Sequence, residues 1–157
     1  SFPERLAGLI LVASHPYPDN EEKRKGRYAT IEKVRQEGVK KALADFPQQL
    51  TPIPHIQEYV GKIIRAANAE GVIGSLQAMA EREDCSDVLA HITMPTAVIL
   101  GKNDLFIPQE QREQMMKQFR HIPFFVVEDA AHMIMMEEPF TVEKIIMNVI
   151  SKIVEKK

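Results

Sequence analysis

Three short segments of the chain have the hydrophobic pattern of buried β-strands. They are Leu6 to Ala13, Pro95 to Gly101 and Pro123 to Glu128. Apolar residues follow one another there with little of the polar alternation that marks a half-exposed strand, so the pattern predicts strands buried on both faces. The second and third segments each start at a proline and are rich in β-branched or aromatic residues, which favour strands.

Two amphipathic helices are predicted around the last of these strands. Gln109 to Phe119 follows a proline and contains good helix formers with apolar residues at helical spacing, which makes a βαβ unit with the second and third strands. A later helix begins at Pro139. Its apolar residues recur every three or four positions, as in a helix that faces a core: Val142, Ile145, Ile146, Val149, Ile150 and Ile153.

The first and second strands are separated by about 80 residues, whereas a simple crossover between parallel strands needs only about a dozen. The excess predicts an inserted helical unit. The fold expected is therefore α/β, a parallel sheet with flanking helices and a helical insertion, divided into residues 1–14, 15–91 and 92–157. The predicted helices of the insertion are Asn20 to Phe46, broken at Gly26 and Gly38, then Pro54 to Asn68, Val72 to Glu83 and Ser86 to His91.

Composition and charge exclude several classes of protein. The chain is 45% hydrophobic with a net charge of −2, so it is not a disordered polar chain and has no basic excess to bind nucleic acid or an anionic membrane. Its longest apolar run, Leu9 to Ala13, is far shorter than the roughly 20 residues of a membrane-spanning helix. Cys85 is the single cysteine, which excludes an internal disulfide and predicts a reducing cytoplasm.

The candidate chemistry lies at the carboxyl ends of the predicted strands, where open parallel sheets bind their ligands. Asp104 follows the second strand and His132 follows the third, so the two side chains are expected to meet at one edge. An Asp that accepts a hydrogen bond from imidazole fixes its tautomer and leaves the other ring nitrogen as a general base. An Asp near a helix start is also a common cap and a loop His is often solvated, so the pair alone leaves both interpretations open.

The sequence around both residues resembles that of the α/β-hydrolase fold family. The stretch 95–108 resembles that family's strand, G-x-x-D, x-x-x-P segment, and 130–139 resembles its A-G-H … E-x-P segment, with Ala131 in place of the usual glycine. The opening residues 2–6 resemble the stretch after the nucleophile helix, so the likeness covers the whole chain. It implies that Asp104 is the acid and His132 the base of a catalytic triad, and that the insertion is a cap.

The same resemblance leaves the triad without its nucleophile. The family's serine lies in a G-x-S-x-G motif that precedes the acid and the base, and this chain contains no such motif. Ser14 follows the first strand but has no flanking glycines, and Cys85 lies beside acidic residues that would raise its pKa. The chain is therefore expected to be a truncated, carboxyl-terminal half of a hydrolase and to be inactive alone.

Other residues near the expected site are assigned by their position. Leu105 beside the acid and Met133 beside the base are predicted to contact substrate, while Met135 and Met136 are predicted to pack in the core. The mixed charges of 19–27 are expected to form a solvated face. No metal or cofactor is expected, because the remaining histidines lack the spacing of metal ligands: His15, His55, His91 and His121.

The function expected from the resemblance is hydrolysis of a carboxylic ester or lactone. Residues 78–95 are similar to the corresponding part of enol-lactone hydrolases and small carboxylesterases. The partners expected are a small ester or lactone substrate and either the missing amino-terminal half or a second copy of the chain. The alternative is a non-enzymatic binding or assembly module that has this scaffold without a nucleophile.

Overall fold

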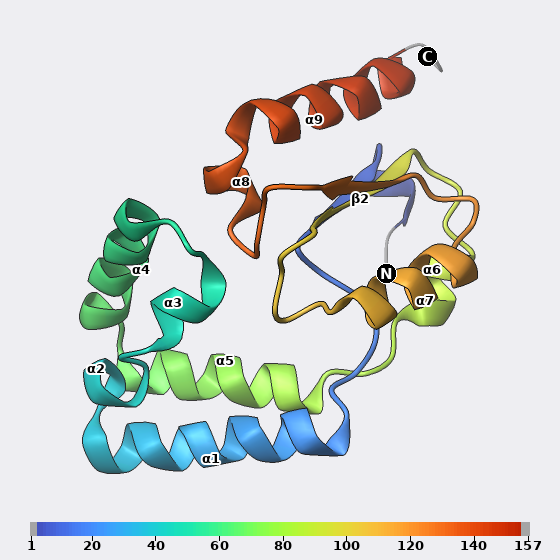
Figure 1. Cartoon of the computed structure of the whole chain (residues 1–157). Coiled ribbons are helices and arrows are strands. Elements are labelled where there is room, and N and C mark those ends of the chain that lie inside the picture. The colour runs from blue at the N-terminus through green and yellow to red at the C-terminus, as the bar shows by residue number, and fades with distance from the viewer. Residues whose placement is uncertain (1–2, 155–157) are drawn as a thin grey trace. The chain divides into compact units, whose positions relative to one another are not determined.

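A computed structural model describes residues 3–154 of the chain, which form two compact units (Figure 1). The sheet unit consists of the two ends of the chain, Ser1–His15 and Asp87–Lys157, and the helical unit is the segment between them, Pro16–Ser86. The helix α6 (Ser86–Ala90), predicted as part of the insertion, groups almost entirely with the sheet unit.

The sheet unit is built on three parallel strands. After a short 3-10 turn, η1 (Pro3–Arg5), the strands are β1 (Leu9–Val12), β2 (Thr96–Gly101) and β3 (Phe124–Val127), in the order β1-β2-β3. Val12 pairs with Ile99, and Gly101 pairs with Val127. The predicted α/β fold with parallel strands is confirmed, and the carboxyl ends of all three strands lie at one edge.

Burial differs between the strands in a way that the sequence pattern does not reveal. Every residue of β2 is buried, whereas β1 is half-buried along its length and β3 is half-buried up to Val127. The prediction that all three strands are buried on both faces is therefore wrong for β1 and β3. The reason is their place in the sheet, because among the described residues β2 has a strand on either side and each of the other two has one neighbour.

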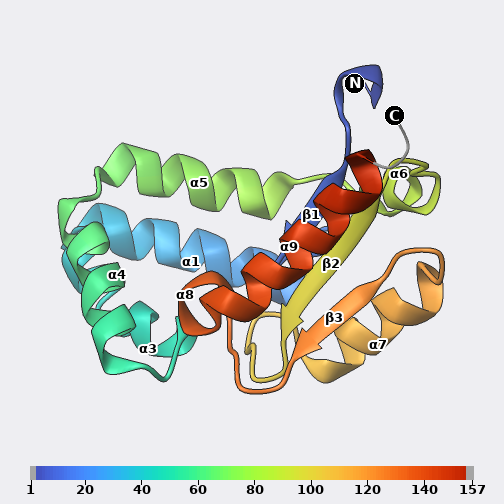
Figure 2. The ribbon, with the colours of Figure 1, turned by 90° about the horizontal axis from the view of Figure 1, so that it is seen from above.

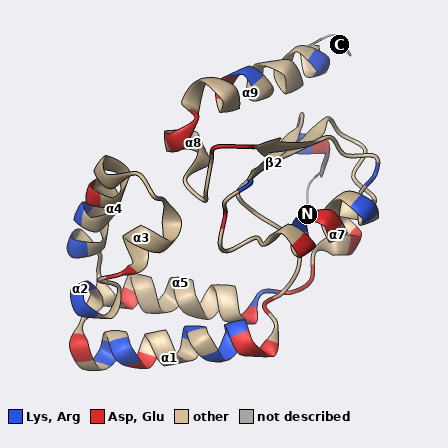
Figure 3. Cartoon of the chain, viewed as in Figure 1, with Lys and Arg blue, Asp and Glu red and all other residues tan. Residues whose placement is uncertain are grey.

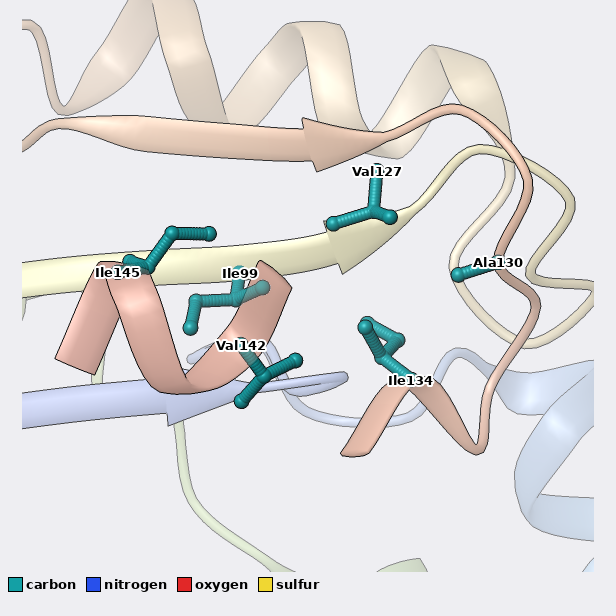
Figure 4. Packing of buried hydrophobic residues seen from close by; sticks show 6 residues of the cluster. All are labelled: Ile99, Val127, Ala130, Ile134, Val142 and Ile145. Carbon is teal, nitrogen blue, oxygen red and sulfur yellow. The ribbon is translucent and has the colours of Figure 1, made fainter. Parts of the chain in front are cut away.

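Helices cover both faces of this sheet. The last helix, α9 (Pro139–Val154), lies over one face, and α7 (Gln109–Gln118) lies against the other (Figures 1 and 2). Because side chains alternate along a strand, Ile99 packs on the α9 side while its neighbours in β2 face α7. The core on the α9 side contains Ile99, Val127, Ala130, Ile134, Val142 and Ile145 (Figure 4).

One prediction about this core is wrong. Met135 was expected beneath the last helix, but it lies 44% exposed, and Met136 is only half-buried. Both belong to α8 (Ile134–Glu137), a single turn in which Ile134 alone points into the core. A helix of one turn buries one face only, so the adjacent methionines are turned away.

The helical unit contains five helices: α1 (Glu21–Glu37), α2 (Val39–Ala42), α3 (Phe46–Leu50), α4 (Pro54–Ala66) and α5 (Ala69–Glu81). α1 and α5 run side by side (Figure 2). The predicted break at Gly26 is absent, because α1 continues through it, whereas Gly38 does end α1 and has a φ of 78°. None of the helices within 3–154 is long and apolar enough to cross a membrane.

Acidic and basic residues are mixed along α1 (Figure 3). The charged segment 19–27, which begins just before this helix, was predicted to be a solvated face, but one of its side chains is buried. The side chain of Asp19 is fully buried and forms ion pairs with Arg27 and Arg82. Burial by itself would raise the pKa of Asp19, but the hydrogen bond and charge of Arg27, with the charges of Arg82 and Lys23, outweigh it and lower the pKa. The carboxylate therefore ties the start of α1 to the residue that follows α5.

This pairing predicts how acid affects stability. Because the folded pKa of Asp19 lies below its usual value of 3.8, the stabilisation is complete above that value and is lost as the pH falls through the folded pKa. The substitution Asp19→Asn should lower the free energy of unfolding at pH 7 by about 1.5–3 kcal/mol. Urea titrations at pH 7 and in acid should show this difference shrinking as the pH falls, while the exposed Asp45→Asn changes little at either pH.

Candidate active site

The acid and the histidine predicted at the carboxyl edge of the sheet are hydrogen-bonded to each other. Nδ1 of His132 lies 2.9 Å from Oδ2 of Asp104. The carboxylate side chain is fully buried, and the imidazole retains 28% of its exposure. The residues come from adjacent loops, after β2 and after β3, so the parallel order of the strands brings them together although 28 positions separate them in the chain.

Backbone groups hold the carboxylate of Asp104 in place. Its Oδ1 accepts the N–H of Phe106 at 2.8 Å and the N–H of Ile107 at 3.3 Å. The carbonyl of Ile107 in turn accepts a hydrogen bond from the buried guanidinium of Arg112 at 2.7 Å. Three donors, two from the backbone and one from imidazole, therefore surround the carboxylate and compensate for its removal from water.

The pair fixes where the imidazole proton resides. An ionised carboxylate can only accept, so Nδ1 of His132 is the donor in its bond to Asp104. The lone pair of a neutral imidazole is then on Nε2. The ring of Phe106 lies 5.0 Å from the imidazole, tilted by 56°, and limits its rotation. This arrangement presents Nε2 as a proton acceptor at the carboxyl edge of the sheet.

The two loops approach each other most closely over Gly101. A Cβ atom at this position would lie 2.0 Å from the carbonyl oxygen of Ala131 and 2.5 Å from that of Ala130. The backbone N–H of Asn103 donates to the oxygen of Ala130 at 2.9 Å. Only a residue without a side chain allows this approach, so Gly101 is required by contact and not by a turn.

The departure from the family pattern at Ala131 causes no strain. Among the described residues, Ala13 is the one non-glycine residue with a positive φ, at 46°, so Ala131 has an ordinary backbone conformation. Ala13 directly follows β1 at the same edge, and for a residue with a Cβ such a conformation costs about 1–2 kcal/mol. The residue types on either side of Ala13, including Ser14, do not predict this positive φ.

The residues predicted to contact substrate flank the pair. Leu105 is 72% exposed and Met133 is half-buried. A pocket of about 540 Å³ lies elsewhere in the sheet unit, at the amino ends of β2 and β3, and contains neither member of the pair. The residues that line it are Ile92, Thr93, Met94, Pro95, Thr96, His121, Ile122, Pro123, Phe125, Asn148, Val149 and Lys152.

Cys85, which lies beside acidic residues in the sequence, is exposed. Across residues 3–154, no three His, Cys, Asp or Glu side chains are grouped so that they could hold a metal ion.

Comparison with solved structures identifies similar proteins. An esterase from Thermogutta terrifontis, solved with malate bound, is 32% identical with a TM-score of 0.86, and the match covers 97% of this chain and 58% of that one. An esterase from Exiguobacterium antarcticum is 24% identical with a TM-score of 0.76, covering 91% and 57%. An enol-lactonase from Burkholderia xenovorans is 18% identical with a TM-score of 0.77, covering 94% and 57%.

These likenesses cover nearly all of this chain but only part of its neighbours. The chain spans less than three fifths of the length of each of these three proteins. Neither a family model nor a curated protein sequence matches it.

The contact at Gly101 gives a testable prediction. Replacing Gly101 with Ala places a methyl group against two backbone oxygens, and overpacking of this kind costs about 1–3 kcal/mol. The loops must separate, so the bond between His132 and Asp104 should weaken as well. The matched control is Gly26→Ala within α1, where a Cβ meets nothing within 4 Å and is expected to stabilise by about 0.4–1 kcal/mol. Equal unfolding free energies for the two variants in urea titrations would contradict the prediction.

Proposed function

We propose that this chain, which has part of the α/β-hydrolase fold, is the carboxyl-terminal part of a hydrolase that cleaves carboxylic esters or lactones. The observation that carries the proposal is the bond between Asp104 and His132, made by a buried carboxylate and a partly exposed imidazole. The names of the similar proteins, two esterases and an enol-lactonase, support the substrate class.

In the proposed reaction His132 is the general base and Asp104 orients it. Nε2 accepts the proton of a serine hydroxyl as the serine oxygen attacks the carbonyl carbon of the substrate. The protonated imidazole then donates that proton to the departing alcohol oxygen, which leaves an acyl-enzyme. Water attacks the acyl carbon while Nε2 accepts its proton; the imidazolium then returns this proton to the departing serine oxygen, which releases the acid product and restores the serine and the neutral imidazole.

The serine is proposed to come from outside this chain. No G-x-S-x-G motif is present in the sequence, and the family places that motif on a strand and helix that precede the acid and the base. The helical unit would act as the cap of the complete enzyme, and Leu105 and Met133 would contact the substrate. We also propose that the complete enzyme is cytoplasmic.

Two surfaces of the sheet unit support a missing partner. The strand β1 pairs only with β2 among the described residues, which leaves its outer edge open to a further strand. The helix α9 has a second apolar face, exposed beside the one on the sheet and formed by Phe140, Met147, Ile150 and Val154. A helix that is apolar on two faces is usually covered on both, and we propose that the amino-terminal half of the hydrolase covers this one.

The absence of a nucleophile motif also favours a second candidate, a module that keeps this scaffold for binding or assembly. The two candidates differ in what the open surfaces receive. A hydrolase needs a partner that carries a serine nucleophile, whereas a binding module needs no reactive residue at all. Ester hydrolysis by the assembled protein distinguishes the two candidates.

Substitutions at the pair test the hydrolase directly. In the enzyme assembled from this chain and its amino-terminal half, Asp104→Asn should lower kcat for an aryl ester about 10⁴-fold, because the amide favours the wrong imidazole tautomer. His132→Ala removes the base and should lower it at least as far. Asp129→Asn, an exposed carboxylate in the loop that carries His132, should leave the rate unchanged.

The chain alone should show no serine-dependent ester hydrolysis. Turnover by the isolated chain that a serine-directed phosphonate abolishes would contradict the proposed origin of the nucleophile. An assembled protein that binds but never hydrolyses esters would favour the binding module.

The open surfaces predict that the isolated chain associates with itself. Light scattering over a series of concentrations should show a mass that rises with concentration, because exposed apolar faces without a partner attract one another. Phe140→Lys, at a side chain that is 83% exposed on the second face of α9, should shift the equilibrium towards monomer. Val88→Lys, at a similarly exposed side chain in α6, should not, and a monomer at all concentrations would argue against the open surfaces.

A further inference from the structure

The peptide group between Ala130 and Ala131, one peptide before the bond that joins Ala131 to His132, is held at both of its polar atoms. The oxygen of this group belongs to Ala130 and accepts the N–H of Asn103 at 2.9 Å. Its N–H belongs to Ala131 and donates to Oε2 of Glu137 at 2.5 Å. The peptide plane is therefore fixed from two sides, once by the loop of the acid and once by α8.

The carboxylate of Glu137 makes this contact at an energetic cost. Its second oxygen, Oε1, is buried and has no hydrogen-bond partner among residues 3–154. Burying a carboxylate oxygen without a donor destabilises the fold. A neutral residue with one acceptor would satisfy the N–H of Ala131 without that cost. What the carboxylate adds is a charge-assisted hydrogen bond, which is shorter and stronger than a neutral one.

The direction of this peptide determines where the imidazole lies. Ala131 is directly bonded to His132, so a rotation of the Ala130–Ala131 peptide moves the histidine backbone with it. The bond from Nδ1 to Asp104 tolerates only a few tenths of an ångström before it weakens. Asn103, which holds the oxygen of the peptide, is the residue next to Asp104. These two hydrogen bonds, from Asn103 and to Glu137, therefore fix the position of the loop that carries His132 relative to the loop that carries Asp104.

We propose that Glu137 is a positioning residue that locks the Ala130–Ala131 peptide and thereby holds the imidazole of His132 on Asp104. It touches neither substrate nor the reacting atoms and acts through the backbone. The consequence for catalysis rests on the function proposed above, but the effect on the imidazole does not, so the two can be tested apart.

The first test reads the imidazole in the 157-residue chain by nitrogen-detected NMR of labelled histidine. In the unsubstituted chain, neutral His132 should have its proton on Nδ1 and show the low-field proton signal of a bond to a carboxylate. Glu137→Leu removes the acceptor and should convert much of this form to the Nε2–H tautomer. Glu137→Gln keeps an acceptor at the same reach and should preserve most of the Nδ1–H form.

Two further variants control for folding and for local charge. Glu137→Asp keeps the charge but shortens the side chain by one methylene, so it should lose part of the Nδ1–H signal even if the leucine variant does not fold. Glu138→Gln alters the neighbouring carboxylate, which accepts from the Thr141 hydroxyl at 3.2 Å, and should leave His132 unchanged. Unchanged His132 signals in the aspartate variant, or a glutamine variant with a native amide spectrum but no Nδ1–H form, would overturn the proposal.

The second test measures rates in the assembled hydrolase. A displacement of about 1 Å at a reacting group can cost about 100-fold in rate, so Glu137→Leu should lower kcat by about that factor with little change in KM. The glutamine variant should recover most of the loss. Loss of the Nδ1–H form together with an unsubstituted assembly that hydrolyses no ester would leave the positioning role standing and refute the proposed function. A lowered kcat with intact His132 signals would refute the positioning role instead.

Discussion

The carboxylate of Asp104 is buried, and a buried carboxylate is stable only where its oxygens accept enough hydrogen bonds. Two backbone N–H groups of the loop after β2 satisfy one oxygen, and the imidazole of His132 satisfies the other. The loop must therefore turn back on itself directly after the acid, and the histidine must arrive from the next strand. Much of the geometry at this edge of the sheet follows from meeting that demand.

Close contact between the two loops allows His132 to reach the carboxylate of Asp104. The loops approach so closely at Gly101 that no side chain fits between them, and the N–H of Asn103 bonds across the gap. The approach depends on β2 and β3 being adjacent and parallel, in the register that pairs Gly101 with Val127. A core of branched aliphatic side chains under α9 fixes that register in turn.

The sheet has an open edge at β1 among the described residues, and the proposed hydrolase needs a serine nucleophile from outside this chain. β2 is buried between its two neighbours, whereas β1 has an open outer edge among the described residues and α9 carries exposed apolar side chains. The chain also spans less than three fifths of the similar esterases and lactonase. A buried carboxylate bonded to a partly exposed imidazole, in a sheet whose β1 edge is open among the described residues, is the arrangement that one part of the proposed hydrolase would present. The large pocket of the sheet unit lies at the opposite edge from this pair.

The sequence by itself determined the local features of this protein. Runs of apolar residues predicted the three strands, helical periodicity predicted α7 and α9, and strand order along the chain predicted that the acid and the histidine share an edge. These features depend on spacing, which can be read from residue types. The helix that continues through Gly26 shows the limit, because packing outweighs the weak helix propensity of one glycine.

Only the tertiary structure decided which groups are buried and which partners they meet. Asp19 looks like part of a solvated charge run, yet arginines from both ends of the helical unit surround it. Met135 looks like core and is exposed, because a single helical turn buries one face. The strain at Ala13 leaves no pattern in the types of the neighbouring residues. Such features depend on where other segments lie, and the types of adjacent residues do not encode that.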